Sequence, residues 1–208
     1  MKASSFLHEK AAFLRSFQGK VTQMNTVTIK KLVYSAICLA LALVLPFLTA
    51  QIPQIGQMLC PMHIPVLLCG FLCGWPWGLA VGFIAPLLRS VTLGMPPLFP
   101  TATAMAFELA AYGALAGILY AKLPKKPLYT YVALLLAMLG GRVVWGLVMF
   151  ALTGISDTTF SLSAFVMGAF ANAIPGIVLH IVLIPVIVLA LRKARLTLNG
   201  RRLTLNER

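Results

Sequence analysis

The chain has 208 residues, of which 60% are hydrophobic and only 10% are charged. A soluble domain carries about 25% charged residues, so the composition excludes an ordinary soluble globular protein and favours one embedded in a bilayer. The formal net charge of +13 does not lead us to expect a nucleic acid partner, because basic residues that flank apolar membrane segments account for this charge. The apolar residues form long runs and not ten-residue alternating segments, which indicates helices and not a barrel.

Residues 1–30 form a basic leader before the first apolar run. Phe6, Phe13 and Phe17 recur in it at near-helical spacing, which fits a helix lying on the inner membrane surface. A disordered leader fits the same residues. The apolar run behind the leader is long enough to span a membrane, so we expect no cleaved signal peptide.

The first spanning helix is expected at about residues 31–48, and a polar, uncharged loop follows it. The next apolar stretch, residues 62–90, is interrupted by the sequence Gly74-Trp-Pro-Trp-Gly78. Each half is short for a span of about twenty residues. The stretch therefore forms either two short spanning helices or a re-entrant hairpin, and both alternatives enter and leave on the same side.

Three further helices are expected at about residues 101–121, 128–152 and 162–191. A proline-rich loop precedes the first, a short basic turn precedes the second, and a loop containing the only acid outside the helices and termini precedes the third. Together with the earlier segments they make six transmembrane helices. We expect one membrane domain, residues 31–192, followed by a basic cytoplasmic tail, residues 193–208.

The positions of the basic residues predict that both termini are cytoplasmic. Fifteen of the seventeen Lys and Arg residues lie in the first 31 residues, in the turn 122–126, or from Arg192 to the end. Cytoplasmic loops are enriched in such residues, and the loops assigned to the opposite side contain none. The sequence therefore predicts an all-α, multi-pass protein of the plasma membrane.

Three charged residues fall inside the predicted helices: Arg89, Glu108 and Arg142. A charge at the bilayer centre costs about 2.5–3.5 kcal/mol, so it faces a partner or a cavity. At about 1.5 Å per helical residue, Glu108, Arg142 and Asn172 are expected roughly 10–15 Å below the outer surface. One interpretation is an ion pair between Glu108 and Arg142 that fixes helix packing. The other is a polar binding cavity open to the outside.

Arg89 favours the cavity, because it gives the group a spare positive charge. Arginine holds a carboxylate with two parallel hydrogen bonds, so a small anion is the expected ligand. His63 either lines the same vestibule or lies at the interface, and His180, deeper in the last helix, is expected to be a packing residue. Tyr112 and Trp145 either stack on a substrate or fill the bundle. The candidate substrate-binding set is His63, Arg89, Glu108, Tyr112, Arg142, Trp145 and Asn172.

Several catalytic and cofactor signatures are absent from the sequence. Without the motif G-x-x-x-x-G-K-[ST], the chain is not expected to hydrolyse ATP by itself. There is also no HExxH and no GxSxG, and we expect no enzymatic activity and no cofactor in this chain. The four cysteines lack a second pair of ligands at zinc-site spacing, so we expect them to pack in the bundle and not to bind a metal: Cys38, Cys60, Cys69 and Cys73.

Four motifs carry a resemblance to a known family. They are Ala36-Ile-Cys-Leu-Ala40, Pro61-Met-His-Ile-Pro-Val-Leu-Leu-Cys-Gly-Phe-Leu-Cys-Gly74, Pro86-Leu-Leu-Arg-Ser90 leading into Gly94-Met-Pro-Pro-Leu-Phe-Pro100, and Ala106-Phe-Glu-Leu-Ala110. With the six helices and the chain length, they resemble the substrate-binding S components of bacterial energy-coupling factor (ECF) vitamin transporters over about residues 30–192.

The resemblance implies the partners and the mechanism. S components work with a transmembrane coupling subunit and with two cytosolic ATPases, which hydrolyse the ATP. The face of the first helix that carries Ala36 and Ala40 is implied to dock on the coupling subunit. The substrate site is implied to lie among the outer loops and the fourth to sixth helices, and the whole S component topples to turn that site toward the cytoplasm.

The chain looks most like the pantothenate and pyridoxine types of S component. The expected spare positive charge favours pantothenate, while pyridoxine, a thiamine precursor and a queuosine precursor remain alternatives. A different alternative is a self-sufficient secondary transporter of a small organic anion, which would need no ATPase partner.

Overall fold

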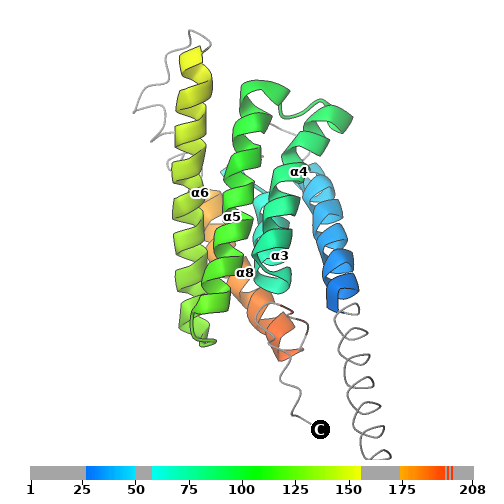
Figure 1. Ribbon diagram of the computed structural model, residues 1–208, viewed down its shortest axis with the longest axis vertical. Helices are drawn as coiled ribbons and strands as arrows, with labels where there is room; N and C mark the ends of the chain where they lie inside the picture. Colours follow the sequence, from blue (N-terminus) through cyan, green and yellow to red (C-terminus); the bar gives the residue numbers. More distant parts are fainter. Residues whose placement is uncertain (1–26, 50–57, 156–173, 195, 197, 199–208) are drawn as a thin grey trace, which may run out of the picture.

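The computed structural model describes residues 27–49, 58–155, 174–194, 196 and 198, and these contain helices and no strand (Figure 1). An N-terminal helix, Val27–Phe47, runs into the short 3₁₀ helix η1 (Leu45–Thr49). The remaining elements, in chain order, are α3 (His63–Cys73), α4 (Trp75–Leu93), η2 (Leu98–Ala102), α5 (Thr103–Lys122), α6 (Pro127–Ile155) and α8 (Ile174–Lys193).

Five helices in the described part of the chain are long and apolar enough to cross a membrane: the N-terminal helix, α4, α5 with η2, α6 and α8. The expected interruption after residue 73 is confirmed, because Gly74, with φ of 97°, separates α3 from α4. The two halves are unequal: α3 has 11 residues, too few for a span, whereas α4 has 19. The sixth expected helix is described only from Ile174, so the count of six spans stays a prediction.

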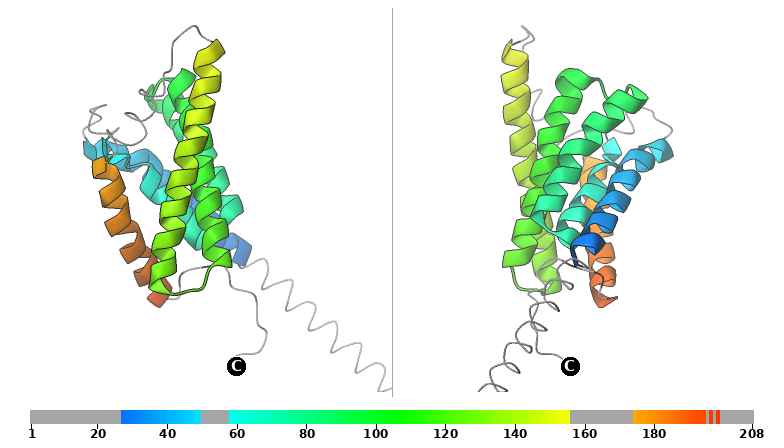
Figure 2. Two further views of the ribbon diagram at one scale, coloured as in Figure 1. Left: turned by 90° about the vertical axis from the view of Figure 1, so that its left-hand side faces the viewer. Right: turned by 45° about the vertical axis from the view of Figure 1, so that its right-hand side comes forward.

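Helix α5 lies at the centre of the bundle, packed against α3, α4 and α6 (Figure 2). Glycines at the contacts bring the helix backbones together. A Cβ atom on Gly70 or on Gly78 would collide with the Gly113 carbonyl group, and one on Gly82 would collide with the Leu109 carbonyl group. Small residues allow close helix approach within a membrane, and here they hold α5 in fixed register against α3 and α4.

The N-terminal helix packs on α3 and α4 through one face, where Ser35, Cys38 and Ala42 are buried. The Cys69 thiol lies 3.5 Å from the Ser35 hydroxyl oxygen, and the Cys73 thiol lies 3.7 Å from the Lys31 carbonyl oxygen. The opposite face of this helix is exposed. This helix is the least buried of the five candidate spans.

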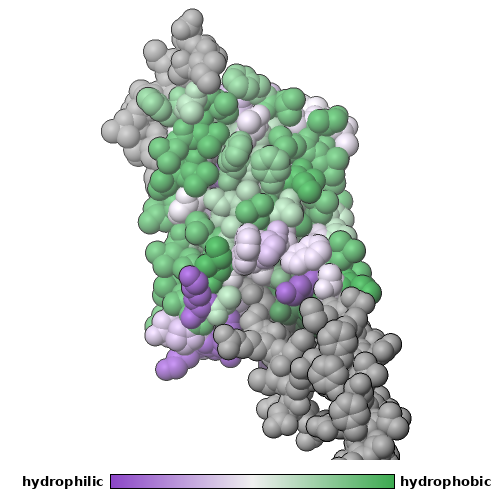
Figure 3. Space-filling model, in the orientation of Figure 1, coloured by the Kyte–Doolittle hydropathy of each residue, from purple (hydrophilic) through white to green (hydrophobic). Residues whose placement is uncertain are grey.

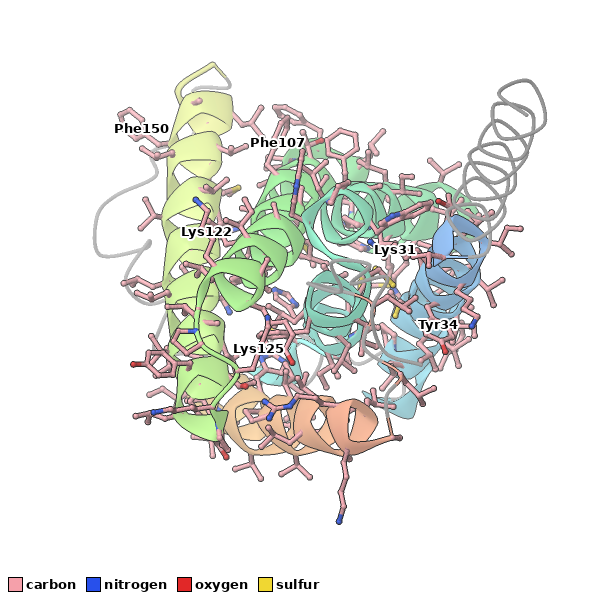
Figure 4. All side chains as sticks on the ribbon, turned by 60° about the horizontal axis from the view of Figure 1, so that its bottom comes forward. Lys31, Tyr34, Phe107, Lys122, Lys125 and Phe150 are labelled. Carbon is pink, nitrogen blue, oxygen red and sulfur yellow. The ribbon has the colours of Figure 1, made fainter. Side chains whose placement is uncertain are left out.

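The two ends of the bundle differ in charge. Lys31, Lys122 and Lys125 lie together at one end, which we call the basic end (Figure 4), and hydrophilic residues gather there on the surface (Figure 3). The loop Gly94–Pro100, at the other end, contains no Lys or Arg; we call this the proline end. The side of the membrane that each end faces remains a prediction, with the basic end assigned to the cytoplasm.

The surface between the two ends is apolar over most of the face seen in Figure 3. Phe107 on α5 and Phe150 on α6 point away from the bundle (Figure 4) and are exposed. Such side chains suit contact with lipid. Polar side chains inside the bundle are therefore exceptions in a largely apolar membrane segment.

Candidate functional site

Glu108 and Arg142 form an ion pair inside the bundle. Arg142 Nη1 lies 3.0 Å from Glu108 Oε1, and the two residues are 8% and 2% exposed. Glu108 lies in the second turn of α5, and Arg142 lies near the middle of α6. The close contact between these helices is aided by Gly141, where any Cβ atom would collide with the Tyr112 ring. The ion pair, one of the two interpretations left open by the sequence, is present.

Two further side chains lie close to the same carboxylate oxygen. The Tyr112 hydroxyl, one turn along α5, donates a hydrogen bond of 3.0 Å to Glu108 Oε1. His63, the first residue of α3, places Nε2 at 3.6 Å from this oxygen, just beyond hydrogen-bond distance. The His63 and Tyr112 rings are 5.2 Å apart between centroids. Three of the expected site residues, His63, Tyr112 and Arg142, thus converge on Glu108.

Two residues that sequence reasoning assigned to packing also belong to this group. The His180 ring on α8 lies nearly parallel to the His63 ring, with centroids 5.9 Å apart. Arg142 Nη2 lies 3.8 Å from the Cys60 sulfur. We call Cys60, His63, Glu108, Tyr112, Arg142 and His180 the polar cluster.

The backbone before α3 explains how His180 reaches the polar cluster. At Gly176, one turn before His180, a Cβ atom would collide with the Met58 carbonyl oxygen. The segment that leads into α3 therefore lies directly on α8. Cys60, in the same segment, has φ of 46°, a left-handed conformation uncommon for a residue other than glycine. A sequence signal did exist, because His180 is the only ionisable residue in α8 before Arg192, and such residues inside spans mark functional sites.

The polar cluster contains hydrogen-bonding groups that have no partner among the described residues. Among the described residues, the buried side-chain nitrogen and oxygen atoms without a partner are His63 Nδ1 and Nε2, Arg142 Nε and His180 Nε2. Every one belongs to the polar cluster. A buried polar group left without a partner costs about 1–3 kcal/mol. The unpartnered atoms are therefore available for hydrogen bonds beyond those made by the described residues.

Arg89, expected in the same site, is placed elsewhere. Its Nη1 donates a hydrogen bond of 2.9 Å to the Leu43 carbonyl oxygen, and its guanidinium lies 5.5 Å from the centre of the Phe47 ring. A cation is favourable at the C-terminal end of a helix, where carbonyl groups lack helical partners. Arg89 thus fastens the N-terminal helix to α4 and brings no spare positive charge to the polar cluster.

Two further residues were expected in the substrate site, Trp145 and Asn172. Trp145 follows Arg142 by three residues on α6 and is partly buried. Asn172 lies outside the described residues. Their assignment to the substrate site stays a prediction. Within the described ranges, no group of three or more His, Cys, Asp or Glu side chains is arranged to hold a metal ion.

Comparison with known families identifies the family to which the chain belongs. The family model described as "ECF transporter, substrate-specific component" matches residues 30–188. Comparison with curated proteins and with solved structures returned no match. The matched residues extend from the N-terminal helix into α8 and include every member of the polar cluster.

Proposed function

Because the chain belongs to the family of ECF transporter substrate-specific components, we propose that it is the substrate-binding subunit of an ATP-driven importer in the bacterial plasma membrane. It is a multi-pass membrane protein, and its family is one of transport subunits and not of enzymes. The proposed substrate is a vitamin or vitamin precursor, and the proposed site is the polar cluster.

One observation carries the assignment of the site: the unpartnered nitrogens of His63, Arg142 and His180. An ion pair that served only to hold α5 against α6 would need Glu108 and Arg142 alone. Two additional buried imidazoles add desolvation cost without completing the pair. A bound molecule with its own donors and acceptors offsets this cost, and a substrate-specific component must bind such a molecule.

The exposed face of the N-terminal helix supports a membrane partner. Ala36 and Ala40 lie on it, one turn apart, flanked by the exposed side chains of Leu32, Val33 and Ile37. Two alanines one turn apart leave a shallow groove in which another helix can approach closely. We propose that this face docks on the transmembrane coupling subunit, and that two cytosolic ATPases supply the energy for toppling the whole chain.

The sequence favoured pantothenate because a spare positive charge was expected at the site, and the polar cluster has no such charge among its described members. That expectation required Arg89 and Arg142 together with a single acid, whereas Arg89 bonds to the Leu43 carbonyl oxygen and Arg142 is paired with Glu108. Pantothenate therefore has no advantage of charge over pyridoxine, a thiamine precursor or a queuosine precursor. All four belong in the test of function.

Reconstitution in liposomes tests this proposal. The chain alone should bind a radiolabelled substrate from this panel but should not accumulate it under a proton or sodium gradient. Uptake should begin only when the coupling subunit, both ATPases and ATP are added. Accumulation by the chain alone under an ion gradient would instead establish a secondary transporter, and conversion of a substrate by the chain alone would establish an enzyme.

A further inference from the structure

The formal charges of the polar cluster cancel. Glu108 and Arg142 lie 3.0 Å apart and are both buried, and the other described members of the cluster are two histidines, a tyrosine and a cysteine. Arg89, the other buried cation, is hydrogen-bonded to the N-terminal helix. A ligand that enters the cluster while the histidines are neutral therefore meets no unopposed charge from the described members of the cluster.

The unpartnered atoms offer donors and acceptors in equal measure. Arg142 Nε carries a hydrogen and is a donor, whereas a neutral His63 ring has one donor and one acceptor nitrogen, neither of them within hydrogen-bond distance of a partner among the described residues. His180 adds Nε2, which has no partner among the described residues and is an acceptor when the proton of the neutral ring lies on Nδ1.

We infer that the polar cluster binds a ligand without net charge that presents hydrogen-bond donors and acceptors side by side, and that it discriminates against carboxylates. The inference rests on the proposed function of the same site. The ligand would complete the hydrogen bonds of His63, His180 and Arg142 while leaving the ion pair intact.

The contacts of Arg142 explain the discrimination against an anion. Two nitrogens of its guanidinium are already used, Nη1 with Glu108 and Nη2 with the Cys60 sulfur. A carboxylate can make the usual two-bond contact with arginine only by displacing one of these partners. If it displaces Glu108, two carboxylates share one buried cation, and the excess negative charge is desolvated.

Matched acid and neutral probes test the inference on the purified full-length chain in nanodiscs. Nicotinate and nicotinamide differ only in a carboxylate against a carboxamide, and pantothenate and pantothenol differ only in a carboxylate against an alcohol. Affinities are measured by isothermal titration calorimetry at about pH 8, above the ordinary imidazole pKa of about 6.5. In whichever pair binds, the neutral member should bind at least about tenfold more tightly than the acid. A tenfold difference in affinity corresponds to about 1.4 kcal/mol.

Glu108→Gln is the matched variant, because it keeps the shape of the side chain and removes the charge that opposes Arg142. It should reverse the preference toward the acid in the same pair. If Glu108→Gln does not fold, the comparison of acid and neutral probes on the wild-type chain decides alone. Equal affinity for the acid, or tighter binding of the acid to the wild-type chain, would overturn the inference.

If none of the four probes binds, the purified chain is denatured and the charge of the molecule that it releases is measured. The measurement is its electrophoretic mobility at about pH 8, where an ordinary carboxylate is ionised. An uncharged molecule supports the inference, and an anion overturns it while leaving the proposed function in place. A chain that binds no probe and releases no molecule contradicts the proposed function, and the inference fails with it.

Discussion

The Glu108 carboxylate on α5 and the Arg142 guanidinium on α6 meet at 3.0 Å in the interior of the bundle. His63 from α3 and Tyr112 from α5 approach the same carboxylate oxygen. Three helices thus place their buried polar side chains at one point. The pair joins α5 to α6, and experiment can separate this structural role from the proposed role in binding.

Removal of the cation alone should destabilise the protein strongly. Arg142→Leu leaves Glu108 as an unpaired buried carboxylate, which costs about 3–5 kcal/mol. Thermal unfolding in detergent should show a large fall in the melting temperature. The double variant Glu108→Gln with Arg142→Leu removes both charges and should recover most of that loss. A single variant as stable as the wild-type chain would show that the carboxylate is not buried beside Arg142.

Arg89 should affect the N-terminal helix and not the ligand. Arg89→Met removes the hydrogen bond to the Leu43 carbonyl oxygen, and hydrogen bonds to charged groups contribute about 1.5–3 kcal/mol. We expect faster amide hydrogen exchange in the N-terminal helix, while ligand affinity changes by less than about threefold, a difference of well under 1.4 kcal/mol. Arg89→Lys, which keeps the charge, serves as the control. A large loss of ligand affinity in Arg89→Met would return Arg89 to the substrate site.

The backbone contact at Gly113 should be intolerant of a single methyl group. In Gly113→Ala the new Cβ atom would collide with the backbone of Gly78 on α4, and overpacking of this kind costs about 1–3 kcal/mol. Gly140→Ala is the matched control, because its Cβ atom would collide only with the end of the flexible Leu115 side chain. Melting temperatures in detergent should rank wild type and Gly140→Ala above Gly113→Ala. Equal melting of the two variants would contradict the close approach of α4 and α5.

The proposed docking face should control assembly and spare binding. Ala36→Leu with Ala40→Leu fills the groove on the exposed face of the N-terminal helix, so the chain should no longer co-purify with the coupling subunit. Ala190→Leu makes a similar change on an exposed position of α8 and should leave assembly intact. Both variants should bind substrate as the wild type does. Assembly that survives the paired substitution would place the docking face elsewhere.

Composition and charge were sufficient to predict the fold class. Long apolar runs without alternating segments exclude a barrel and favour helices, which satisfy their own backbone hydrogen bonds in lipid. The break at Gly74 was visible as a cluster of glycine, proline and tryptophan. The ion pair was one of two interpretations open from the sequence, because very few cations lie inside the predicted helices to pair with Glu108.

The position of Arg89 and the membership of His180 were not predictable from depth along a helix. The position of a residue along a helix gives its depth in the membrane but not the direction in which its side chain points. Arg89 donates a hydrogen bond to the Leu43 carbonyl oxygen, near the end of the N-terminal helix. His180 lies in the polar cluster because Gly176 allows the segment before α3 to lie directly on α8. Contacts of this kind depend on the packing of three helices, which a single sequence does not specify.

The presence of a ligand in the polar cluster is tested most directly by native mass spectrometry of the purified chain. The wild-type protein should carry a small molecule, and the variant His63→Leu with His180→Leu, which removes three of the unpartnered nitrogens, should be folded and carry none. A wild-type chain with no bound molecule, even after incubation with the substrate panel, would contradict the account. So would a histidine variant that retains the molecule as well as the wild type does.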